Sequence, residues 1–336
     1  MTRLARRATI PTLFVATALA LSGCATSAST AAPTATSASP TATEAAAAFP
    51  RTVSVPAGAT TAATEVTIQA EPQRIAALSY ESAALAAELG LTDRLVMVPA
   101  EASNPALTDH ADAFADVDAT IATTSKIDPE AVFAQHPDLV ILTARHGQED
   151  SAGAALQALG VPVLVLPNAW STPDQVAADI ALVGEATGAD DQAATLADEL
   201  TTALAGDDEP AADAPRVLVL NNQAGRPFVT AGTAFPLEML RLAGAQDVSA
   251  ELGLKTTGPI TAEQIIDANP DAILMIDMNG SGEASFASLL KNPAVAGLPA
   301  VTDGRTHLVL GKNVQALGLS STPAGLADLK TWVGSL

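Results

Sequence analysis

The sequence predicts an α/β protein with two Rossmann-like lobes, each built on a mostly parallel central sheet, joined by a rigid helical linker. Three observations support this fold class. Apolar strands alternate with helical segments in both halves, which is typical of parallel sheets covered on both faces. One sequence pattern occurs twice, starting at Ile127 and at Ile260. Between the two copies, apolar residues recur at helical spacing.

The repeated pattern predicts a short capped helix, a Pro-Asp turn and a buried strand each time. Glu130 precedes Pro137-Asp138 in the first copy, and Glu263 precedes Pro270-Asp271 in the second. Acids in a first helical turn are favoured by the helix dipole, so either glutamate alone has a structural explanation. Because Glu, Pro and Asp match in both copies, Glu130 and Glu263 are candidates for a paired role.

The first 50 residues are predicted to lie outside the folded core. Arginines precede an apolar run from Ile10 to Leu21, and Leu21-Ser22-Gly23-Cys24 resembles the bacterial lipobox. We therefore expect residues 1–23 to be a lipoprotein signal peptide and Cys24 to carry the lipid anchor. An ordinary secretory signal with a coincidental cysteine is the alternative. Residues 24–50 are almost all Ala, Ser, Thr and Pro, which predicts a disordered tether.

The remaining elements follow in the same order in each half. The first lobe, 51–171, is expected to contain an edge hairpin, an opening strand, a helix ending at a glycine and a closing strand: Arg51–Ile68, Arg74–Leu78, a helix ending at Gly90, and Pro162–Leu166. The second lobe, 209–336, repeats this order with an extra hairpin: Arg216–Leu220, Pro227–Gly232, a helix ending at Gly244, and His307–Leu310. Residues 172–208 form the linker, and Thr322 is the expected N-cap of a terminal helix.

Charge and motif content exclude several functions. The net charge of −21 argues against nucleic acid, because phosphate binding needs a basic face. The catalytic motifs Gly-x-Ser-x-Gly and His-Glu-x-x-His, the phosphate loop and Gly-x-Gly-x-x-Gly do not occur, and the four histidines are scattered. The sequence therefore predicts no enzyme and no metal held directly by the protein. A surface-anchored hydrolase and an adhesion or scaffold protein remain the alternatives from other classes.

Ligands of open α/β sheets bind beyond the carboxyl ends of the strands. That rule selects polar and aromatic residues that would line a cleft suited to a soluble ligand. The predicted ligand-binding residues are Tyr80, Arg145, His146, Trp170, Asn222, Arg226, Lys312 and Asn313.

From about residue 73 to 336 the chain resembles the iron-siderophore, haem and cobalamin family of ABC-transporter substrate-binding lipoproteins, the class III periplasmic-binding-protein fold. The likeness is carried by Gln73–Leu78, Leu89–Val96 and both copies of the repeat. It implies a ligand cleft between the lobes and docking of Glu130 and Glu263 onto arginines of a permease that works with an ATPase. It also implies a monomer on the extracytoplasmic side, held to the cell membrane through its lipid anchor only, with no intrinsic cofactor.

The resemblance leaves the ligand open, and an Fe(III)-siderophore complex is the expectation. Residues 121–126 lack the tyrosine that many haem binders of the family carry there, although Tyr80 or His146 could substitute. An aromatic content of 3% is low for a cobalamin cleft. Anionic chelates would need Arg145, Arg226 and Lys312, whereas neutral or cationic hydroxamate chelates would tolerate so acidic a protein. Haem or cobalamin is the alternative ligand.

Overall fold

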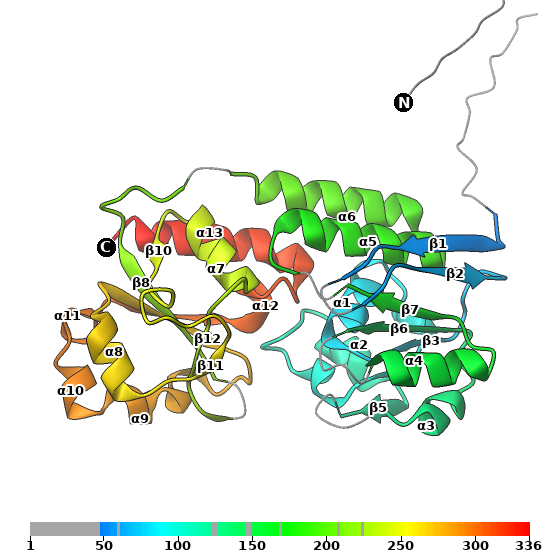
Figure 1. Ribbon diagram of the computed structural model, residues 1–336, viewed down its shortest axis with the longest axis horizontal. Coiled ribbons are helices and arrows are strands. Elements are labelled where there is room, and N and C mark those ends of the chain that lie inside the picture. Colours follow the sequence, from blue (N-terminus) through cyan, green and yellow to red (C-terminus); the bar gives the residue numbers. More distant parts are fainter. Residues whose placement is uncertain are drawn as a thin grey trace, which may run out of the picture. The chain divides into compact units, whose positions relative to one another are not determined.

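The computed structural model describes residues 48–58, 61–122, 127–144, 149–167, 170–206, 209–222 and 225–336 of the 336-residue chain. The predicted signal peptide, Cys24 and most of the tether lie outside the described residues. From Ala45 to Leu336 the chain forms one compact unit (Figure 1). None of the helices in the described ranges is both long and apolar enough to cross a membrane.

The first lobe is built on a fully parallel sheet with strand order β5-β4-β3-β6-β7. Its strands are β3 (Ile75–Ala77), β4 (Leu95–Pro99), β5 (Ala119–Ile121), β6 (Leu139–Thr143) and β7 (Val163–Leu166). Its helices are α1 (Tyr80–Glu88), α2 (Ala111–Ala115), α3 (Pro129–Phe133) and α4 (Glu149–Ala158). Every residue of β3 and β6 is buried, as expected for central strands with both faces covered.

The second lobe contains a mixed sheet with the order β11-β9-β8-β12-β13, and β10 pairs with β8 off this path. Its strands are β8 (Arg216–Asn221), β9 (Phe228–Val229), β10 (Gln246–Asp247), β11 (Gly258–Pro259), β12 (Ala272–Asp277) and β13 (Thr306–Leu310). Strands β8, β12 and β13 are parallel, whereas β9 runs antiparallel to β8. The extra hairpin predicted within Pro227–Gly232 is wrong: this segment contributes the single strand β9, which pairs antiparallel with β8 and with β11. The two-lobe α/β fold class is confirmed.

Short helices surround the second sheet. They are α7 (Phe235–Leu242), α8 (Ala262–Ala268), α9 (Ala287–Leu290), α10 (Pro293–Ala296), α11 (Pro299–Thr302), α12 (Gly311–Val314) and α13 (Thr322–Val333). The N-cap prediction for α13 is wrong. Ser321 occupies the cap position, and Thr322 is the first helical residue, with a fully buried side chain. The close approach of α12 to α13 explains Gly325, where a Cβ would overlap the backbone oxygen of Asn313.

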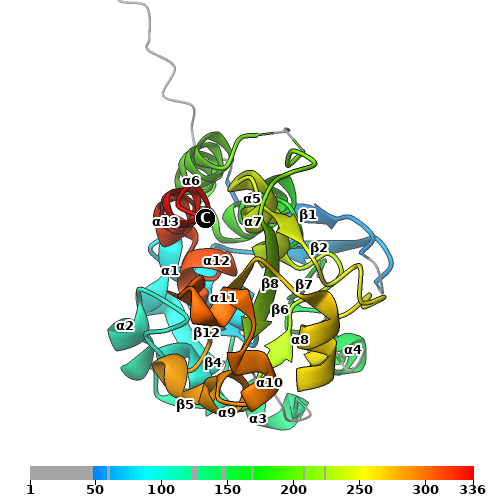
Figure 2. The same cartoon turned by 90° about the vertical axis from the view of Figure 1, so that its left-hand side faces the viewer.

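The linker consists of two helices, α5 (Pro173–Thr187) and α6 (Asp190–Ala203), that pack against each other. Gly188 ends α5 in the left-handed conformation at φ 78°, and Gly184 has no room for a Cβ beside Ala193. The helical structure is as predicted, but the linker folds back on itself. Figures 1 and 2 both place α5, α6 and α13 along one side of the unit.

The amino-terminal hairpin of β1 (Arg51–Val55) and β2 (Thr64–Ile68) forms its own two-stranded sheet, not an edge of the first lobe's sheet. Its apolar face joins the core, and β1 contacts α5. The Arg51 guanidinium lies 2.7 Å from a carboxylate oxygen of Asp190 and donates to the Glu185 carbonyl at 2.9 Å. These contacts fasten the hairpin to the turn between the linker helices.

Candidate ligand cleft and docking helices

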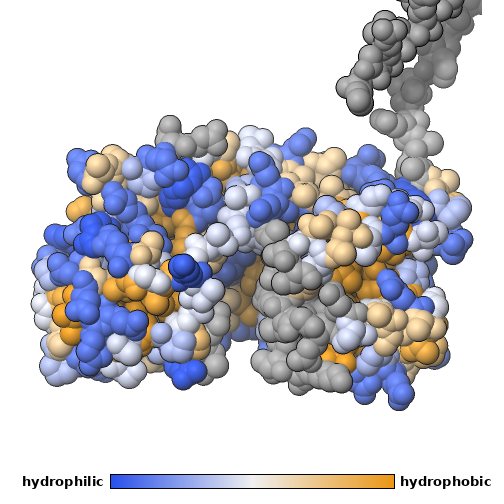
Figure 3. Space-filling view, in the orientation of Figure 1, coloured by the Kyte–Doolittle hydropathy of each residue, from blue (hydrophilic) through white to orange (hydrophobic). Residues whose placement is uncertain are grey.

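The carboxyl ends of the two sheets face each other. The segment after β4 reaches the loops after β12 and β13: Asn104 Nδ2 donates to the Met278 carbonyl at 3.2 Å, and Lys312 N donates to Ala106 O at 2.9 Å. Lys312 Nζ also lies 2.5 Å from a carboxylate oxygen of Asp109. In Figure 3 the surface is indented between the two halves. Ligand-binding loops of α/β sheets lie at such facing strand ends.

On the first lobe, Tyr80 and Glu81 begin α1 at this edge. Ser79 caps the helix through a reciprocal pair of bonds with Ser82, which fixes the first turn. Tyr80 is half-buried, whereas Glu81 is 3% exposed and accepts a hydrogen bond from Thr143 Oγ1 at 3.2 Å. Of the predicted ligand residues, Arg145 and His146 lie outside the described residues.

Trp170, just after β7, is turned towards the linker. Its indole N–H donates to Asp179 Oδ2 of α5 at 2.8 Å, and the ring packs against the core. Asp179 is 3% exposed, and this burial raises the pKa of its carboxyl to about 7, although the hydrogen bond from Trp170 opposes the rise. Trp170 therefore couples the edge of the cleft to the helical linker.

Replacing Asp179 with asparagine is expected to remove a pH dependence of stability. Because burial raises the pKa from 3.8 to about 7, the folded state holds a proton that the unfolded chain releases between these values. Stability therefore falls as pH rises through that window, by up to about 4 kcal/mol. Asn keeps an oxygen for the Trp170 N–H, so the variant should be more stable than wild type at pH 8 and similar at pH 4. Urea unfolding at both values measures this.

The exposed Asp198 on α6 provides the matched control. Asp198→Asn should leave the pH profile of the unfolding free energy unchanged. An unaltered profile in Asp179→Asn would show that the Asp179 carboxyl titrates normally in the folded protein.

On the second lobe, a buried polar cluster shapes the loop after β12. Asn222 is 1% exposed, donates from Nδ2 to Asp277 Oδ1 at 2.7 Å and accepts from Met278 N at 2.6 Å. Asp277 also accepts backbone N–H groups from Gly280 at 3.0 Å and Gly282 at 2.7 Å. Burial alone would raise the pKa of Asp277, but the hydrogen bonds from Asn222 and the loop outweigh it and lower the pKa.

The side chain of Asn222 is thus hydrogen-bonded to the loop after β12, and the carboxylate of Asp277 fixes the conformation of this loop. Asp277 is not among the ligand-binding residues predicted from the sequence. A usable signal was present: an Asp at the end of a buried strand, followed by the Gly-rich stretch Asn279-Gly280-Ser281-Gly282, is typical of a carboxylate that caps backbone N–H groups.

The other predicted cleft residues that the structure describes, Arg226, Lys312 and Asn313, differ in their exposure and in their existing contacts. Arg226 is exposed, and its guanidinium carbon lies 5.1 Å from the centroid of the Phe228 ring. The ammonium of Lys312 is paired with Asp109 across the two lobes, and Asn313 lies on α12 beside it. The structure therefore brings Tyr80, Trp170, Asn222, Lys312 and Asn313 to the facing edges and leaves Arg226 in the turn before β9. Their contact with a ligand stays a prediction.

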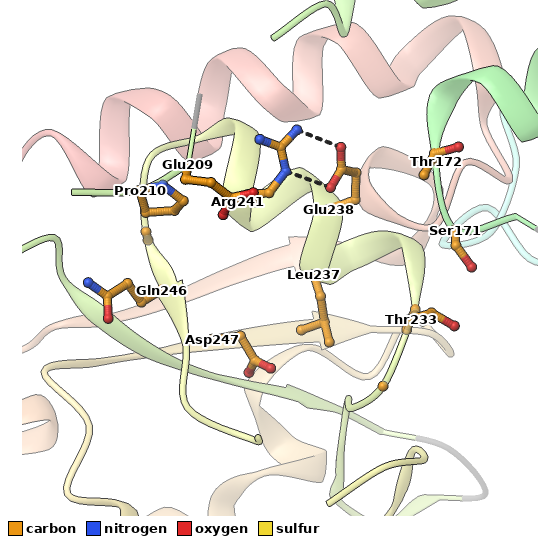
Figure 4. Close-up of a pocket in the computed structure, with 13 residues that line it drawn as sticks. Ser171, Thr172, Glu209, Pro210, Thr233, Leu237, Glu238, Arg241, Gln246 and Asp247 are labelled. Atoms are coloured by element: carbon orange, nitrogen blue, oxygen red, sulfur yellow. Dashed lines mark hydrogen bonds and ion pairs between the residues drawn. The ribbon is translucent and has the colours of Figure 1, made fainter. Parts of the chain in front are cut away.

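A separate pocket of about 660 Å³ lies beside this region (Figure 4). Arg241 and Glu238 form a bidentate ion pair on its wall, and Leu237 and Asp247 point into it. Burial raises the pKa of Asp247, and hydrogen bonds from Ser249 oppose this. None of the six predicted ligand residues that the structure describes lines this pocket. Its lining is Ser171, Thr172, Glu209, Pro210, Gly232, Thr233, Ala234, Leu237, Glu238, Arg241, Ala245, Gln246 and Asp247.

The two glutamates of the repeat occupy equivalent positions on α3 and α8. Asp128 caps α3 by accepting from Glu130 N at 3.0 Å, and Thr261 caps α8 by accepting from Gln264 N at 3.3 Å. Both glutamates are exposed. Hydrogen bonds from the backbone and from Thr261 lower the pKa of Glu263.

A matched pair of arginines fastens both helices. Arg74 donates to the carbonyls of Gln135 and His136 at 2.6 and 2.9 Å, and Arg216 donates to those of Ala268 and Asn269, both at 3.0 Å. The aspartates of the Pro-Asp turns in turn accept the backbone N–H of these arginines. The repeat therefore encodes one rigid unit twice. Figure 1 shows α3 and α8 in opposite halves, both away from the linker helices.

The fold and the facing strand ends define a two-lobe substrate-binding protein, and comparison with known proteins supports this class. A sequence model described as periplasmic binding protein matches residues 75–308. The chain belongs to the periplasmic binding protein family, whose members are substrate-binding transporter components and not enzymes. In the described residues no group of three or more His, Cys, Asp or Glu side chains could hold a metal ion.

The chain is 28% identical over 224 residues to the uncharacterized ABC transporter substrate-binding lipoprotein YvrC of Bacillus subtilis (strain 168). The matched segment covers 63% of this chain and 66% of YvrC. Among solved structures, the periplasmic heme-binding protein RhuT from Roseiflexus sp. RS-1 has a TM-score of 0.65 at 22% identity, covering 78% of this chain and 98% of that one. An ABC-type Fe3+-hydroxamate transport system protein from Saccharomonospora viridis has a TM-score of 0.64 at 22% identity, covering 85% and 99%. At these identities the structural likeness concerns the fold.

Proposed function

We propose that this chain is the lipid-anchored receptor of an ABC importer, which captures a ferric siderophore between its lobes and delivers it to the permease. The proposal depends on two features that occur together in this chain. The loops at the strand ends of the two lobes face each other, and each lobe has an exposed glutamate at the matching position of the repeat. The first feature suits a ligand held between lobes, and the second suits docking onto a symmetric membrane partner. Cys24 would hold the receptor at the extracytoplasmic face of the membrane.

The charges near the cleft favour a neutral or cationic chelate of the hydroxamate type. Lys312 is neutralised by Asp109, while Glu81 and Asp277 lie buried at the strand ends. An anionic chelate would have to displace that ion pair or rely on Arg226, which is exposed over Phe228. The likeness to a protein of an Fe3+-hydroxamate system agrees with this ligand class.

Haem is the second candidate ligand, for a specific reason. Tyr80 is the chain's one tyrosine, and it lies half-buried at the carboxyl edge of the first sheet, where its phenol oxygen could ligate iron. The fold likeness to heme-binding proteins agrees with this alternative.

Fluorescence titration distinguishes the two ligands, because only one of the two tryptophans lies by the cleft. Trp170 follows β7, whereas Trp332 stacks on His307 of the second lobe with the ring centroids 5.1 Å apart. A ferric trihydroxamate should quench Trp332→Phe strongly and Trp170→Phe weakly, at one equivalent. A Soret shift with haemin, and no quenching by any ferric hydroxamate, would replace the siderophore with haem.

A further inference from the structure

Phe133 is one of two large hydrophobic side chains that are exposed in the described residues. Its side chain is 39% exposed, and the other, Leu159, is 46% exposed. Phe133 is the last residue of α3 and follows Glu130 by three positions, which places both side chains on neighbouring parts of one helix face. An aromatic ring and a carboxylate are therefore presented together on the first lobe.

The ring is held in place although the fold does not bury it. Val132, its neighbour in the chain, is fully buried and packs the inner face of α3 against the core. The Arg74 guanidinium fixes the residues that follow, Gln135 and His136, and the His136 ring lies 6.5 Å from the Phe133 ring. A side chain whose helix is already fixed loses little conformational entropy when a partner covers it.

The corresponding position on the second lobe differs. Ile266 occupies the place of Phe133 on α8 and is half-buried. Leu159 follows α4, a helix that packs against α3. In Figure 3 apolar and hydrophilic atoms lie side by side over the region of α3 and α4 at the lower right. The apolar character is thus specific to the first lobe, while the exposed glutamate is common to both.

We propose that Phe133 is the apolar anchor of the contact between the first lobe and the permease, inserting into an apolar recess next to the cation that pairs with Glu130. This proposal rests on the docking role proposed for the two glutamates. Aromatic residues at the centre of interfaces dominate binding energy, and a covered ring excludes water from a neighbouring ion pair and so strengthens it. Charge complementarity selects the occupant: the carboxylate beside the ring requires a partner that offers a cation and an apolar surface together. On the second lobe, where Ile266 stands in place of the aromatic ring, the contact with the permease depends mainly on the charge of Glu263.

The test uses the full receptor loaded with ferric hydroxamate and the permease–ATPase complex in nanodiscs. Phe133→Ser should weaken receptor binding at least tenfold and reduce the stimulation of ATP hydrolysis, while the Kd for the chelate and the melting temperature stay unchanged. Phe133→Leu, which keeps an apolar side chain, should retain most of the affinity. Leu159→Ser is the matched control and should bind as wild type does.

Two outcomes overturn the anchor while leaving the proposed function intact. One is wild-type permease binding by Phe133→Ser when Glu130→Ala with Glu263→Ala fails to bind. In the other, Phe133→Ser binds the permease as strongly as wild type does but no longer self-associates, although the wild-type protein does. That result would mean that the ring contacts a second copy of this chain. If the double glutamate variant also binds normally, the docking proposal itself is contradicted.

Discussion

Replacing Glu130 and Glu263 together with alanine is expected to abolish chelate uptake while leaving chelate affinity within about twofold of wild type. Both carboxylates are exposed in the first turns of α3 and α8. Neither glutamate is next to a predicted cleft residue in the sequence. A charge pair that is desolvated on docking is worth about 2–5 kcal/mol when one partner is truncated. Losing two such pairs should weaken permease binding by at least about 100-fold, since each 1.4 kcal/mol is tenfold.

The control is a second double variant at exposed glutamates outside these helices, Glu65→Ala with Glu199→Ala. It removes the same charge from the protein and should transport normally. Wild-type docking should also weaken as salt is added, because salt screens exposed charges. Loss of chelate binding in the Glu130 and Glu263 variant would show that these residues serve the ligand or the fold and not the permease.

Asp277→Ala is expected to cost about 3–5 kcal/mol of unfolding free energy and at least tenfold in chelate affinity. The carboxylate is 2% exposed and accepts from Asn222, Gly280 and Gly282, among others. Each buried donor left without a partner costs about 1–3 kcal/mol. The affinity falls because the freed loop includes Met278, whose carbonyl accepts from Asn104 of the other lobe.

Chemical denaturation and chelate titration of the same sample measure both effects. Asp303→Ala is the control, since Asp303 is exposed and its side chain makes surface contacts: an ion pair with Arg305 at 3.3 Å and a hydrogen bond from Thr302 Oγ1 at 3.2 Å. Surface ion pairs are worth less than about 1 kcal/mol. A stable Asp277→Ala variant with unchanged chelate affinity would mean that the loop after β12 does not shape the site.

The sequence predicts the backbone of this protein well because its signals are local. The Asp128 cap, the left-handed Gly188 and the buried strands β6 and β12 each follow from a few neighbouring residues. The repeat adds a second observation of each element. The fold class, the linker helices and the position of both glutamates were therefore predictable.

Side-chain pairing between the lobes was not predictable. Lys312 was expected to face a ligand, but its ammonium pairs with Asp109, which is 203 residues earlier in the chain. Trp170 and Asn222 were correctly placed at strand ends, yet the N–H groups of both side chains are held by buried carboxylates, Asp179 and Asp277. The Lys312 and Asn222 pairings depend on how segments that follow separate strands meet, and no local pattern contains that information.

Native mass spectrometry of the receptor purified from its own host tests directly whether the protein captures a ferric siderophore. We expect a one-to-one complex whose added mass equals an Fe(III)-chelate, lost together with its iron on collisional activation. The same complex should form again when the stripped protein is mixed with that chelate. A co-purified haem or corrinoid, or a protein that binds no iron complex under these conditions, would show that the receptor does not capture a ferric siderophore.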